Sequence, residues 1–496
     1  MHWDLLEDAA RSYGGPSLHS DRWYTRESFL EAATSVAKTL RRNVRPGDFV
    51  LIQDTDYVGS AIAVFALWRL GAVPVPTPGW WTEADKAAVA LRTGAVCEIN
   101  GQGAITRDYV RSTISSRSTG SQETAIVFCT SGTTGRPKLV AHSSASLLSS
   151  LALTVGVSVG DAFDTLRVLK AIHSKNEGLV SASLREATLG LRFMTTSAMS
   201  TIAGFALLQR ALLLGDVLVC GAGLGAEKIT EDMEHDEVQC LQTSAFLAGR
   251  LIGVQQRKGH NLNSLVSVGI GGSVVTEKLM AQVENTFGAI ALNGYGMTET
   301  GGPVMTTQAT ENPTARWRGW SRVLPGVQFQ VDTNAEPVGE LSIKSPALMY
   351  GQFGLDGQVL LSDPSQYFRT GDLVEVASDG MLRIVGRCSD MIMRGAQRID
   401  PAIIESVIED VSGIEIAAVV GGPSRVSGEE DVVAVVVVAV DHNTRHLEDE
   451  VRRACMSALP VSHVPRRVVV VDELAEPDDR ALCRRDARLK SAAGGS

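Results

Sequence analysis

The sequence predicts an α/β protein: a large N-terminal domain of parallel sheets layered with helices, carrying a small β-barrel-like subdomain, and a small mobile α+β C-terminal domain. Helical and strand patterns alternate up to about residue 300, which is typical of parallel sheets covered on both faces. Short strands separated by Gly, Pro and Asp turns follow over residues 315–386. A compact unit with its own pattern begins beyond Gly386. The expected domains are residues 1–386 and residues 387–496.

The first alternation is clear in residues 28–40, where apolar side chains recur at helical spacing. Residues 48–52 predict a short buried strand. Residues 61–70 predict an apolar helix closed by Gly71, and residues 73–76 predict the end of the next strand.

The stretch after residue 315 predicts a small antiparallel sheet or barrel, because its strands are short and separated by turn residues. The expected strands are residues 327–331, 340–343, 373–376 and 382–385.

In the C-terminal unit, Pro401 favours the first turn of a helix to about Val411, which Gly413 ends. The nine apolar residues Val432–Val440 are too few for a membrane span, which takes about 20, and predict a buried strand. We also expect a disordered tail over residues 491–496. The other expected elements are strands at 416–420 and 468–471 and a helix at 447–459.

Composition excludes several classes of protein. The chain has 496 residues, 44% of them hydrophobic, so it is not globally disordered. Its 46 basic and 56 acidic residues give a net charge of −10, and no segment is basic enough to predict nucleic-acid binding. The acidic N-terminus does not resemble a signal peptide. Seven cysteines without a CxxC pair argue against a disulfide scaffold or zinc site and predict a reducing cytoplasm, with no membrane partner.

Residues 124–138 carry the strongest functional pattern. An apolar strand runs into a loop with four hydroxyls, two glycines and a lysine. Glycines let backbone N–H groups approach phosphate oxygens, and hydroxyls add donors. The spacing is not that of the Walker loop, and a plain Gly/Thr turn is the alternative interpretation. The candidate phosphate-binding residues are Thr130, Ser131, Gly132, Thr133, Thr134, Gly135 and Lys138.

The segment TSGTTGRPK at residues 130–138 resembles the signature loop of the adenylate-forming superfamily. That superfamily includes acyl- and aryl-CoA synthetases, peptide-synthetase adenylation domains and luciferases. Four further motifs follow in the expected order, so the resemblance covers nearly the whole chain. It implies that residues 1–386 bind the adenylate and the acyl group, that residues 387–496 form a mobile lid, and that CoA is the acceptor.

The second motif, NGYGMTE at residues 293–299, resembles the family's YGxTE motif. The resemblance implies that the Tyr295 ring stacks on adenine, that Thr298 contacts the α-phosphate and that Glu299 helps to hold Mg²⁺. A carboxylate suits Mg²⁺ because it is a hard oxygen ligand. A Gly-flanked turn with a buried Tyr is the alternative. The other expected adenylate contacts in this motif are Asn293, Gly294, Gly296 and Met297.

The remaining motifs are a landmark at residues 339–341, an RTGD-like segment and a GRxxD-like hinge. The resemblance implies that Asp372 accepts hydrogen bonds from both ribose hydroxyls, as an ionised carboxylate can. It also implies that Arg387 reaches ribose or phosphate and that Asp390 is the pivot of the small domain. Gly395 would let the pantetheine thiol approach the acyl carbon. An Asp in an ordinary turn remains the alternative at both aspartates.

The pattern breaks at the C-terminus, where family members have a PxxxSGKxxR-like segment. Its lysine bridges the α-phosphate and the substrate carboxylate while the adenylate forms, and so offsets transition-state charge. Here Ala481 falls at the lysine position and Arg480 before it. Lys490 is the one lysine beyond Gly386. Either Arg480 serves instead, although a planar guanidinium replaces a compact ammonium poorly, or Lys490 swings in, or adenylation is crippled.

The acyl pocket is expected between residues 165–180, 269–274 and the Tyr295 loop. His173 falls where acyl-CoA ligases carry a gating His, although it departs from the common HxxG spacing and a surface His is the alternative. Asp164 only half matches the Asp of amino-acid-activating relatives, which argues against an amino-acid substrate. The glycines expected along the acyl tunnel, with room for a bulky acid, are Gly269, Gly271 and Gly272.

The function predicted is acyl-CoA synthesis from an acyl-adenylate and CoA, with the ATP-dependent half-reaction weak or absent. The partners would be a carboxylic acid or its adenylate, CoA and a separate adenylating enzyme; use of ATP and Mg²⁺ stays open. One alternative is a complete ATP-dependent ligase that uses Arg480 or Lys490, and a lesser one is delivery to a carrier-protein thiol. An alternative from another class is a catalytically silent protein that binds acyl-adenylate or nucleotide.

Overall fold

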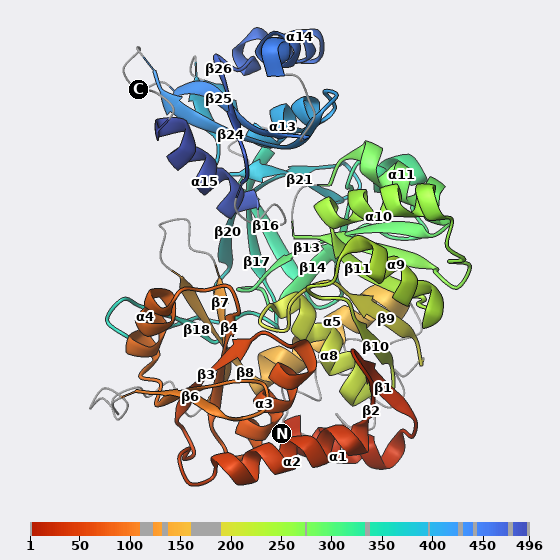
Figure 1. The fold of residues 1–496 in the computed structure, drawn as a ribbon. Coiled ribbons are helices and arrows are strands. Elements are labelled where there is room, and N and C mark those ends of the chain that lie inside the picture. The colour runs from red at the N-terminus through yellow and green to blue at the C-terminus, as the bar shows by residue number, and fades with distance from the viewer. Residues whose placement is uncertain are drawn as a thin grey trace.

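The protein is described by a computed structural model, in which a large N-terminal body carries a small C-terminal domain (Figure 1). This arrangement of mixed sheets and helices confirms the predicted fold class. The described residues are 2–109, 123–130, 137–159, 190–272, 275–332, 338–394, 397–424, 430–439, 444–474 and 480–493.

The N-terminal region builds a four-stranded sheet in the order β4-β3-β5-β6, with β3 parallel to both of its neighbours. The helix predicted over residues 28–40 begins two residues earlier, because the Thr25 hydroxyl accepts the Ser28 N–H in a capping box. The predicted apolar helix is α3, most of whose residues are buried. The elements are α1 (His2–Ser12), α2 (Arg26–Leu40), β3 (Phe49–Asp54), α3 (Tyr57–Arg69), β4 (Val73–Pro78), α4 (Glu83–Thr93), β5 (Cys97–Ile99) and β6 (Ile105–Asp108).

The largest sheet has nine strands in the order β15-β14-β13-β12-β11-β9-β10-β1-β2, and its centre from β13 to β1 is parallel. Apolar residues of α9, α10 and α11 pack on one face, and those of α8 pack on the other. Its strands are β1 (Pro16–His19), β2 (Trp23–Thr25), β9 (Arg192–Thr195), β10 (Val217–Cys220), β11 (Cys240–Ser244), β12 (Ser267–Gly271), β13 (Ile290–Met297), β14 (Gly302–Thr306) and β15 (Arg322–Val323). The helices are α5 (Ser144–Val159), α8 (Ile202–Leu214), α9 (Ala226–His235), α10 (Ala245–Lys258), α11 (Glu277–Phe287) and α12 (Pro313–Trp317).

A third sheet, β19-β18-β8-β7, departs from the parallel arrangement expected up to residue 300. β7 and β8 pair antiparallel, and residues 131–137 alone connect them. A parallel crossover needs a dozen residues or more, so this short connection can only form a hairpin. The strands are β7 (Thr124–Thr130), β8 (Lys138–Ser143), β18 (Gly351–Phe353) and β19 (Val359–Leu361).

The antiparallel sheet predicted after residue 315 is confirmed, in the order β16-β17-β20-β21. Its strands are β16 (Gln328–Asp332), β17 (Val338–Lys344), β20 (Phe368–Val376) and β21 (Leu382–Arg387). β20 and β21 lead from the large body to the small domain (Figure 1).

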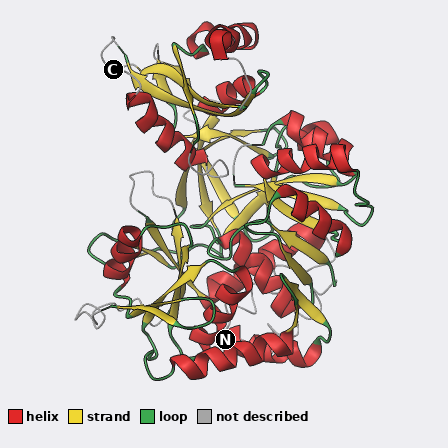
Figure 2. Cartoon of the chain, in the orientation of Figure 1, coloured by secondary structure: helices red, strands yellow, loops and turns green. Residues whose placement is uncertain are grey.

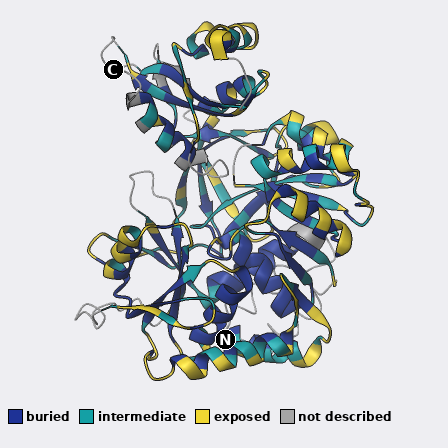
Figure 3. Ribbon diagram, viewed as in Figure 1, coloured by how far each residue is buried: buried dark blue, intermediate teal, exposed yellow. Residues whose placement is uncertain are grey.

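The small domain contains the sheet β24-β25-β26, with α13 and α14 on one face and α15 on the other (Figure 2). Residues 432–437 of the predicted buried strand are buried in β25, and alternate residues pack toward the two helical layers. Figure 3 colours much of this sheet as buried. The elements are β22 (Ile392–Arg394), β23 (Gln397–Ile399), α13 (Pro401–Glu409), β24 (Ile414–Pro423), β25 (Glu430–Val438), α14 (Leu447–Ala458), β26 (Arg467–Val471) and α15 (Arg480–Ala493).

The tail prediction is wrong for residues 491–493, which continue α15. Ser491 is buried, and its carbonyl oxygen accepts a hydrogen bond of 2.6 Å from the Arg467 guanidinium. Across the described ranges, no helix has the length and apolar character of a membrane span. All seven cysteines lie in these ranges and none is in a disulfide.

Candidate active site

Three predicted site residues from three strands meet in one polar cluster, which we call the carboxylate cluster: Tyr295, Asp372 and Arg387. The Tyr295 hydroxyl donates to Asp372 Oδ2 at 2.6 Å, and Arg387 Nε donates to Oδ1 at 2.6 Å. Asp372 and Arg387 are direct cross-strand partners on β20 and β21. Because Asp372 is only 4% exposed, both of its oxygens are held in a defined direction.

The protonation of this cluster follows from its surroundings. Burial raises the pKa of Tyr295 well above its usual value, and the Asp372 carboxylate raises it further, so the phenol stays protonated and donates. Burial alone would lower the pKa of Arg387, but the Asp372 carboxylate outweighs that effect and raises it. Arg387 therefore stays charged.

The strands beside the cluster explain two of the motifs. A Cβ at Gly296 would lie 2.0 Å from the carbonyl oxygen of Gly302, so only glycine permits this pairing of β13 with β14. The Thr370 hydroxyl accepts the Asp372 N–H at 3.1 Å and donates to the Leu341 carbonyl at 2.8 Å. The landmark at residues 339–341 thus supports the strand that carries Asp372.

On the phosphate side, Thr130 and Lys138 are register partners at the ends of β7 and β8. Lys138 Nζ lies 3.7 Å from Glu299 Oε1, so the loop lysine and the YGxTE carboxylate meet. The predicted contacts Ser131, Gly132, Thr133, Thr134 and Gly135 lie outside the described residues.

Sequence reasoning missed His142, whose Nε2 lies 2.8 Å from the Thr298 carbonyl oxygen. Burial lowers the pKa of His142 to about 4, although the Thr298 contact opposes that shift, so the ring is neutral near pH 7. It therefore carries the proton on Nε2 and donates to Thr298, with Ser146 Oγ 3.1 Å from Nδ1. The sequence feature that could have identified His142 is its position on β8, four residues after Lys138.

Glu299 is a candidate Mg²⁺ ligand. No group of three or more His, Cys, Asp or Glu side chains gathers around one point in the described ranges. Mg²⁺ keeps several waters and is held by one or two carboxylates plus substrate phosphates, so one carboxylate fits the ion in the presence of a nucleotide. The ion would neutralise phosphate charge there.

The predicted acyl-pocket glycines lie beside the same strand, because β12 pairs with β13 and Gly271 is opposite Gly294. A Cβ at Gly294 or Gly272 would meet no atom within 4 Å, and one at Gly269 would meet none closer than 3.7 Å. Gly272 also has φ +83°, which favours glycine. His173 lies outside the described residues.

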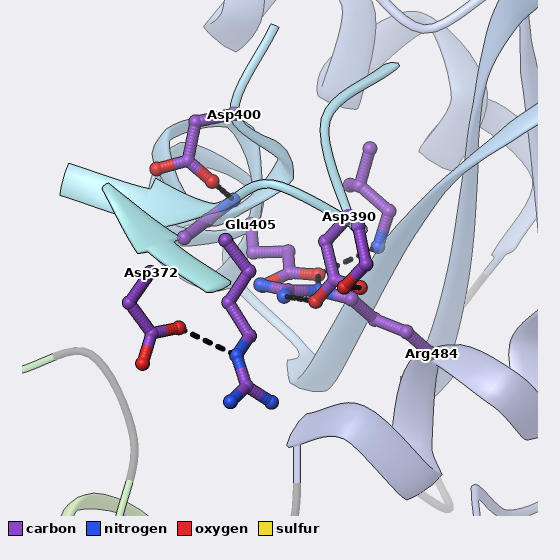
Figure 4. A network of polar contacts seen from close by, with 9 residues as sticks. Asp372, Asp390, Asp400, Glu405 and Arg484 are labelled. Atoms are coloured by element: carbon purple, nitrogen blue, oxygen red, sulfur yellow. Dashed lines mark hydrogen bonds and ion pairs between the residues drawn. The ribbon is translucent and has the colours of Figure 1, made fainter. Parts of the chain in front are cut away.

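The predicted pivot Asp390 is buried, and its Oδ2 accepts a hydrogen bond of 2.8 Å from Arg484 Nη1 (Figure 4). Arg484 also binds both oxygens of Glu405. Sequence reasoning missed Arg484, although the final Arg of PxxxSGKxxR falls on it in the register that places Ala481 at the lysine. Gly395 lies outside the described residues.

The segment that departs from the family pattern begins α15, with Ala481 in its first turn. Lys490 is nine residues further on, about 14 Å along the helix axis. Its ammonium donates to the Glu473 carbonyl at 2.7 Å and pairs with Asp486 at 2.7 Å. Arg480 was the other candidate to replace the lysine, and its side chain lies outside the described part of the structure.

Comparison with known proteins gives concordant results. The family model described as AMP-binding enzyme matches residues 91–353, and that described as AMP-binding enzyme C-terminal domain matches residues 403–477. The chain is 24% identical over 485 residues to 4-coumarate–CoA ligase-like 6 of Oryza sativa subsp. japonica, covering 91% of this chain and 79% of that protein. It is 23% identical over 274 residues to 2-succinylbenzoate–CoA ligase of Listeria monocytogenes serovar 1/2a, covering 55% and 56%.

Solved structures share the fold. o-Succinylbenzoate CoA synthetase (MenE) from Bacillus subtilis, in complex with its acyl-adenylate intermediate, superposes with a TM-score of 0.79 at 19% identity over 98% of each chain. The anthranilate CoA ligase AuaEII, in complex with anthranoyl-AMP, gives a TM-score of 0.77 at 16% identity over 99% of this chain and 98% of that chain.

Proposed function

Because the chain belongs to the AMP-binding enzyme family, whose members form adenylates, we propose that it is an acyl-CoA ligase specialised for the second half-reaction. It transfers an acyl group from an acyl-adenylate to CoA, and its own ATP-dependent adenylation is weak or absent. One observation carries the proposal: the carboxylate cluster of Tyr295, Asp372 and Arg387 is complete, whereas Ala481 stands at the lysine position.

The transfer needs little from the protein beyond binding and orientation. The CoA sulfur attacks the acyl carbon, and a C–S bond forms. The bond between that carbon and the phosphate oxygen breaks, AMP leaves with the electron pair, and the thiol proton passes to solvent. AMP is a good leaving group, so this step requires no general acid.

The N-terminal residues supply the binding. Asp372 faces the ribose hydroxyls, Tyr295 stacks on adenine, and Lys138 and Thr130 flank the phosphate. Lys138 also pairs with Glu299, which keeps the lysine charge close to the proposed position of the phosphate. The lid of residues 387–496 turns about Asp390 to admit the thiol.

Forming the adenylate is harder, because the carboxylate of the acid and the phosphates of ATP repel each other. Losing the cation that offsets this charge costs on the order of 10²–10³ in rate. Lys490 does not replace it, since it lies far along α15 and is engaged with Glu473 and Asp486. Arg484 does not replace it either, because both of its partners are buried carboxylates. A separate enzyme therefore supplies the adenylate.

The substrate class we propose is a bulky, aromatic carboxylic acid. Several proteins similar to the chain are named for coumarate, succinylbenzoate and anthranilate. The open space at Gly294 on the site strand suits a ring.

The test is to incubate the protein with CoA and synthetic benzoyl-, 4-coumaroyl- or octanoyl-adenylate and to measure thioester by mass spectrometry. We expect turnover with an aromatic adenylate and loss of turnover in Asp372→Ala. Tight binding of these adenylates without thioester formation would favour the silent binding protein instead.

A further inference from the structure

Arg484 is a buried cation that the proposed reaction does not use. It is 7% exposed, on α15 of the small domain. Nε and Nη2 donate to the two oxygens of Glu405 at 2.8 and 2.7 Å, and Nη1 donates to Asp390 at 2.8 Å (Figure 4). Such a fork of hydrogen bonds fixes direction as well as charge, which a lysine cannot do.

Glu405 ties this arginine to the sheet of the small domain. Glu405 lies on α13, and its Oε1 also accepts the Val419 N–H of β24 at 2.9 Å. β24 is an edge strand, so this carboxylate satisfies a donor that would otherwise be buried without a partner. α15, α13 and β24 are therefore joined through Arg484, and Asp390 is joined to all three.

The residues just before Asp390 are hydrogen-bonded to the large body. Arg387 donates to Asp372 of the large body, and the Cys388 N–H donates to the Gly371 carbonyl at 2.8 Å. The link between the two attachments is thus limited to Cys388 and Ser389, with a weak turn contact of 3.2 Å from the Asp390 N–H to the Arg387 carbonyl.

The contacts between the lid and the large body, which a turning lid would break, are weaker than those around Arg484. Lys278 on α11 pairs with Asp410 beyond α13, but both side chains are more than half exposed, so this pair is worth little. Phe246 of α10 packs on the small-domain core. By contrast, removing one partner of a buried ion pair leaves the other charge buried without a counterion, which is strongly unfavourable. The lid is therefore held weakly to the body and strongly to its own pivot.

We propose that Arg484 is a positioning residue that fixes Asp390 to the small domain, so that the lid turns as one rigid unit over Cys388–Ser389. The proposal rests on the proposed function, in which the lid must turn to admit CoA. It also explains why this segment keeps Arg484 where the lysine has been lost, since the arginine serves the pivot and not the adenylation step.

The first test measures amide hydrogen exchange over residues 388–394 in the full chain without ligand. Arg484→Met should speed exchange there about tenfold, a coupling typical of residues in one network. Asp390→Asn should do the same, and the double variant should be no faster than either single variant. Arg484→Lys keeps the charge without the fork and should fall between, which preserves the test if Arg484→Met does not fold.

The control is Arg210→Met, which removes an equally buried arginine from its pair with Asp216 at 2.8 Å in the large body. It should leave hinge exchange unchanged. Equal hinge exchange in the wild type and Arg484→Lys, independent addition of the Arg484 and Asp390 effects, or the same response in Arg210→Met would each overturn the proposal.

The second test separates positioning from structural damage by kinetics with 4-coumaroyl-adenylate and CoA. Arg484→Lys should lower kcat about tenfold and leave the KM for the adenylate within twofold, because the adenylate site lies on the large body. A rise in KM with unchanged kcat would contradict the pivot role. If the wild type forms no thioester, the proposed function fails, and the exchange measurements still decide the role of Arg484.

Discussion

The carboxylate cluster and the start of α15 both correspond to motifs of the superfamily. The cluster contains every residue expected from its motifs, whereas α15 begins without the expected lysine. In the cluster, Asp372 accepts hydrogen bonds of 2.6 Å from both Tyr295 and Arg387, so these three side chains fix one another's orientation. In α15, Ala481 falls at the position expected for the lysine, while Arg484 three residues later binds Glu405 and Asp390. Under the proposed function, the large body binds the adenylate, whereas synthesis of the adenylate would need a cation on the lid.

The largest effect is expected from Asp372→Ala, which removes the centre of the cluster and the carboxylate proposed to accept both ribose hydroxyls. A hydrogen bond to a charged group contributes about 1.5–3 kcal/mol, so the loss of two should lower kcat/KM for thioester formation from 4-coumaroyl-adenylate by about 10²–10³-fold. Asp216→Ala breaks the fully buried pair with Arg210 in the large body and should leave the kinetics of the folded protein within twofold. Similar losses in both variants would show that the cluster has no special role.

The next largest effect is a gain. Ala481→Lys restores the family cation and should raise acid-dependent pyrophosphate release from ATP by about 10²-fold, the scale of one transition-state contact. Transfer from a synthetic adenylate should stay within twofold. Lys490→Gln is the companion variant, and it should change neither rate, because that ammonium serves Glu473 and Asp486. If Lys490→Gln abolished pyrophosphate release, Lys490 would be the missing cation.

A smaller effect is expected from Tyr295→Phe, which keeps the ring but removes the hydroxyl that orients Asp372. A hydrogen bond to a charged group contributes about 1.5–3 kcal/mol, so affinity for the adenylate should fall roughly tenfold or more while kcat changes little. Titration calorimetry with a non-hydrolysable adenylate measures this directly. Tyr57→Phe removes an equally buried hydroxyl, whose 2.6 Å bond goes to the Gly204 carbonyl, and should not alter affinity.

Some of the residues in these comparisons were predicted from the sequence, and others were found only in the structure. Local patterns predicted α2 and the four strands of the small antiparallel sheet, because periodicity and turn chemistry act over a few residues. The resemblance to the adenylate-forming superfamily predicted the motif positions Tyr295, Asp372 and Arg387. Neither predicted the hydrogen bonds among those three residues, which join positions up to 77 apart in the chain. The antiparallel hairpin of β7 and β8 was missed because alternation alone does not fix strand direction. Arg484 was missed because its partners lie 94 and 79 positions away.

The smallest effect concerns the acidic surroundings of Arg484. The pKa of Asp400 is raised from 3.8 to about 6, chiefly by burial and to a smaller extent by the carboxylates of Glu405 and Asp390, while its bond to the Ala402 N–H and the charge of Arg484 oppose the shift. The folded protein therefore binds this proton more tightly than the unfolded chain, so stability falls as the pH rises from about 4 to about 6.

Asp400→Asn keeps the N-cap of α13 without the charge. It should stabilise the small domain by about 1–2 kcal/mol at pH 7.5, less than the full shift implies because the group is partly solvated, and the gain should vanish toward pH 4. Urea unfolding at several pH values measures this gain. Asp363→Asn is the control of opposite sign, because hydrogen bonds from Ser365 lower the pKa of Asp363, and it should stabilise at neither pH. A gain in Asp400→Asn that does not change with pH would contradict the explanation.

The central claim is that this chain uses an adenylate that it does not itself make efficiently. The most direct measurement is the rate of pyrophosphate release from ATP and 4-coumaric acid by a preparation that converts 4-coumaroyl-adenylate and CoA to thioester. The account predicts thioester formation together with pyrophosphate release about 10²-fold slower than in Ala481→Lys. Pyrophosphate release by the wild type as fast as by Ala481→Lys would contradict it.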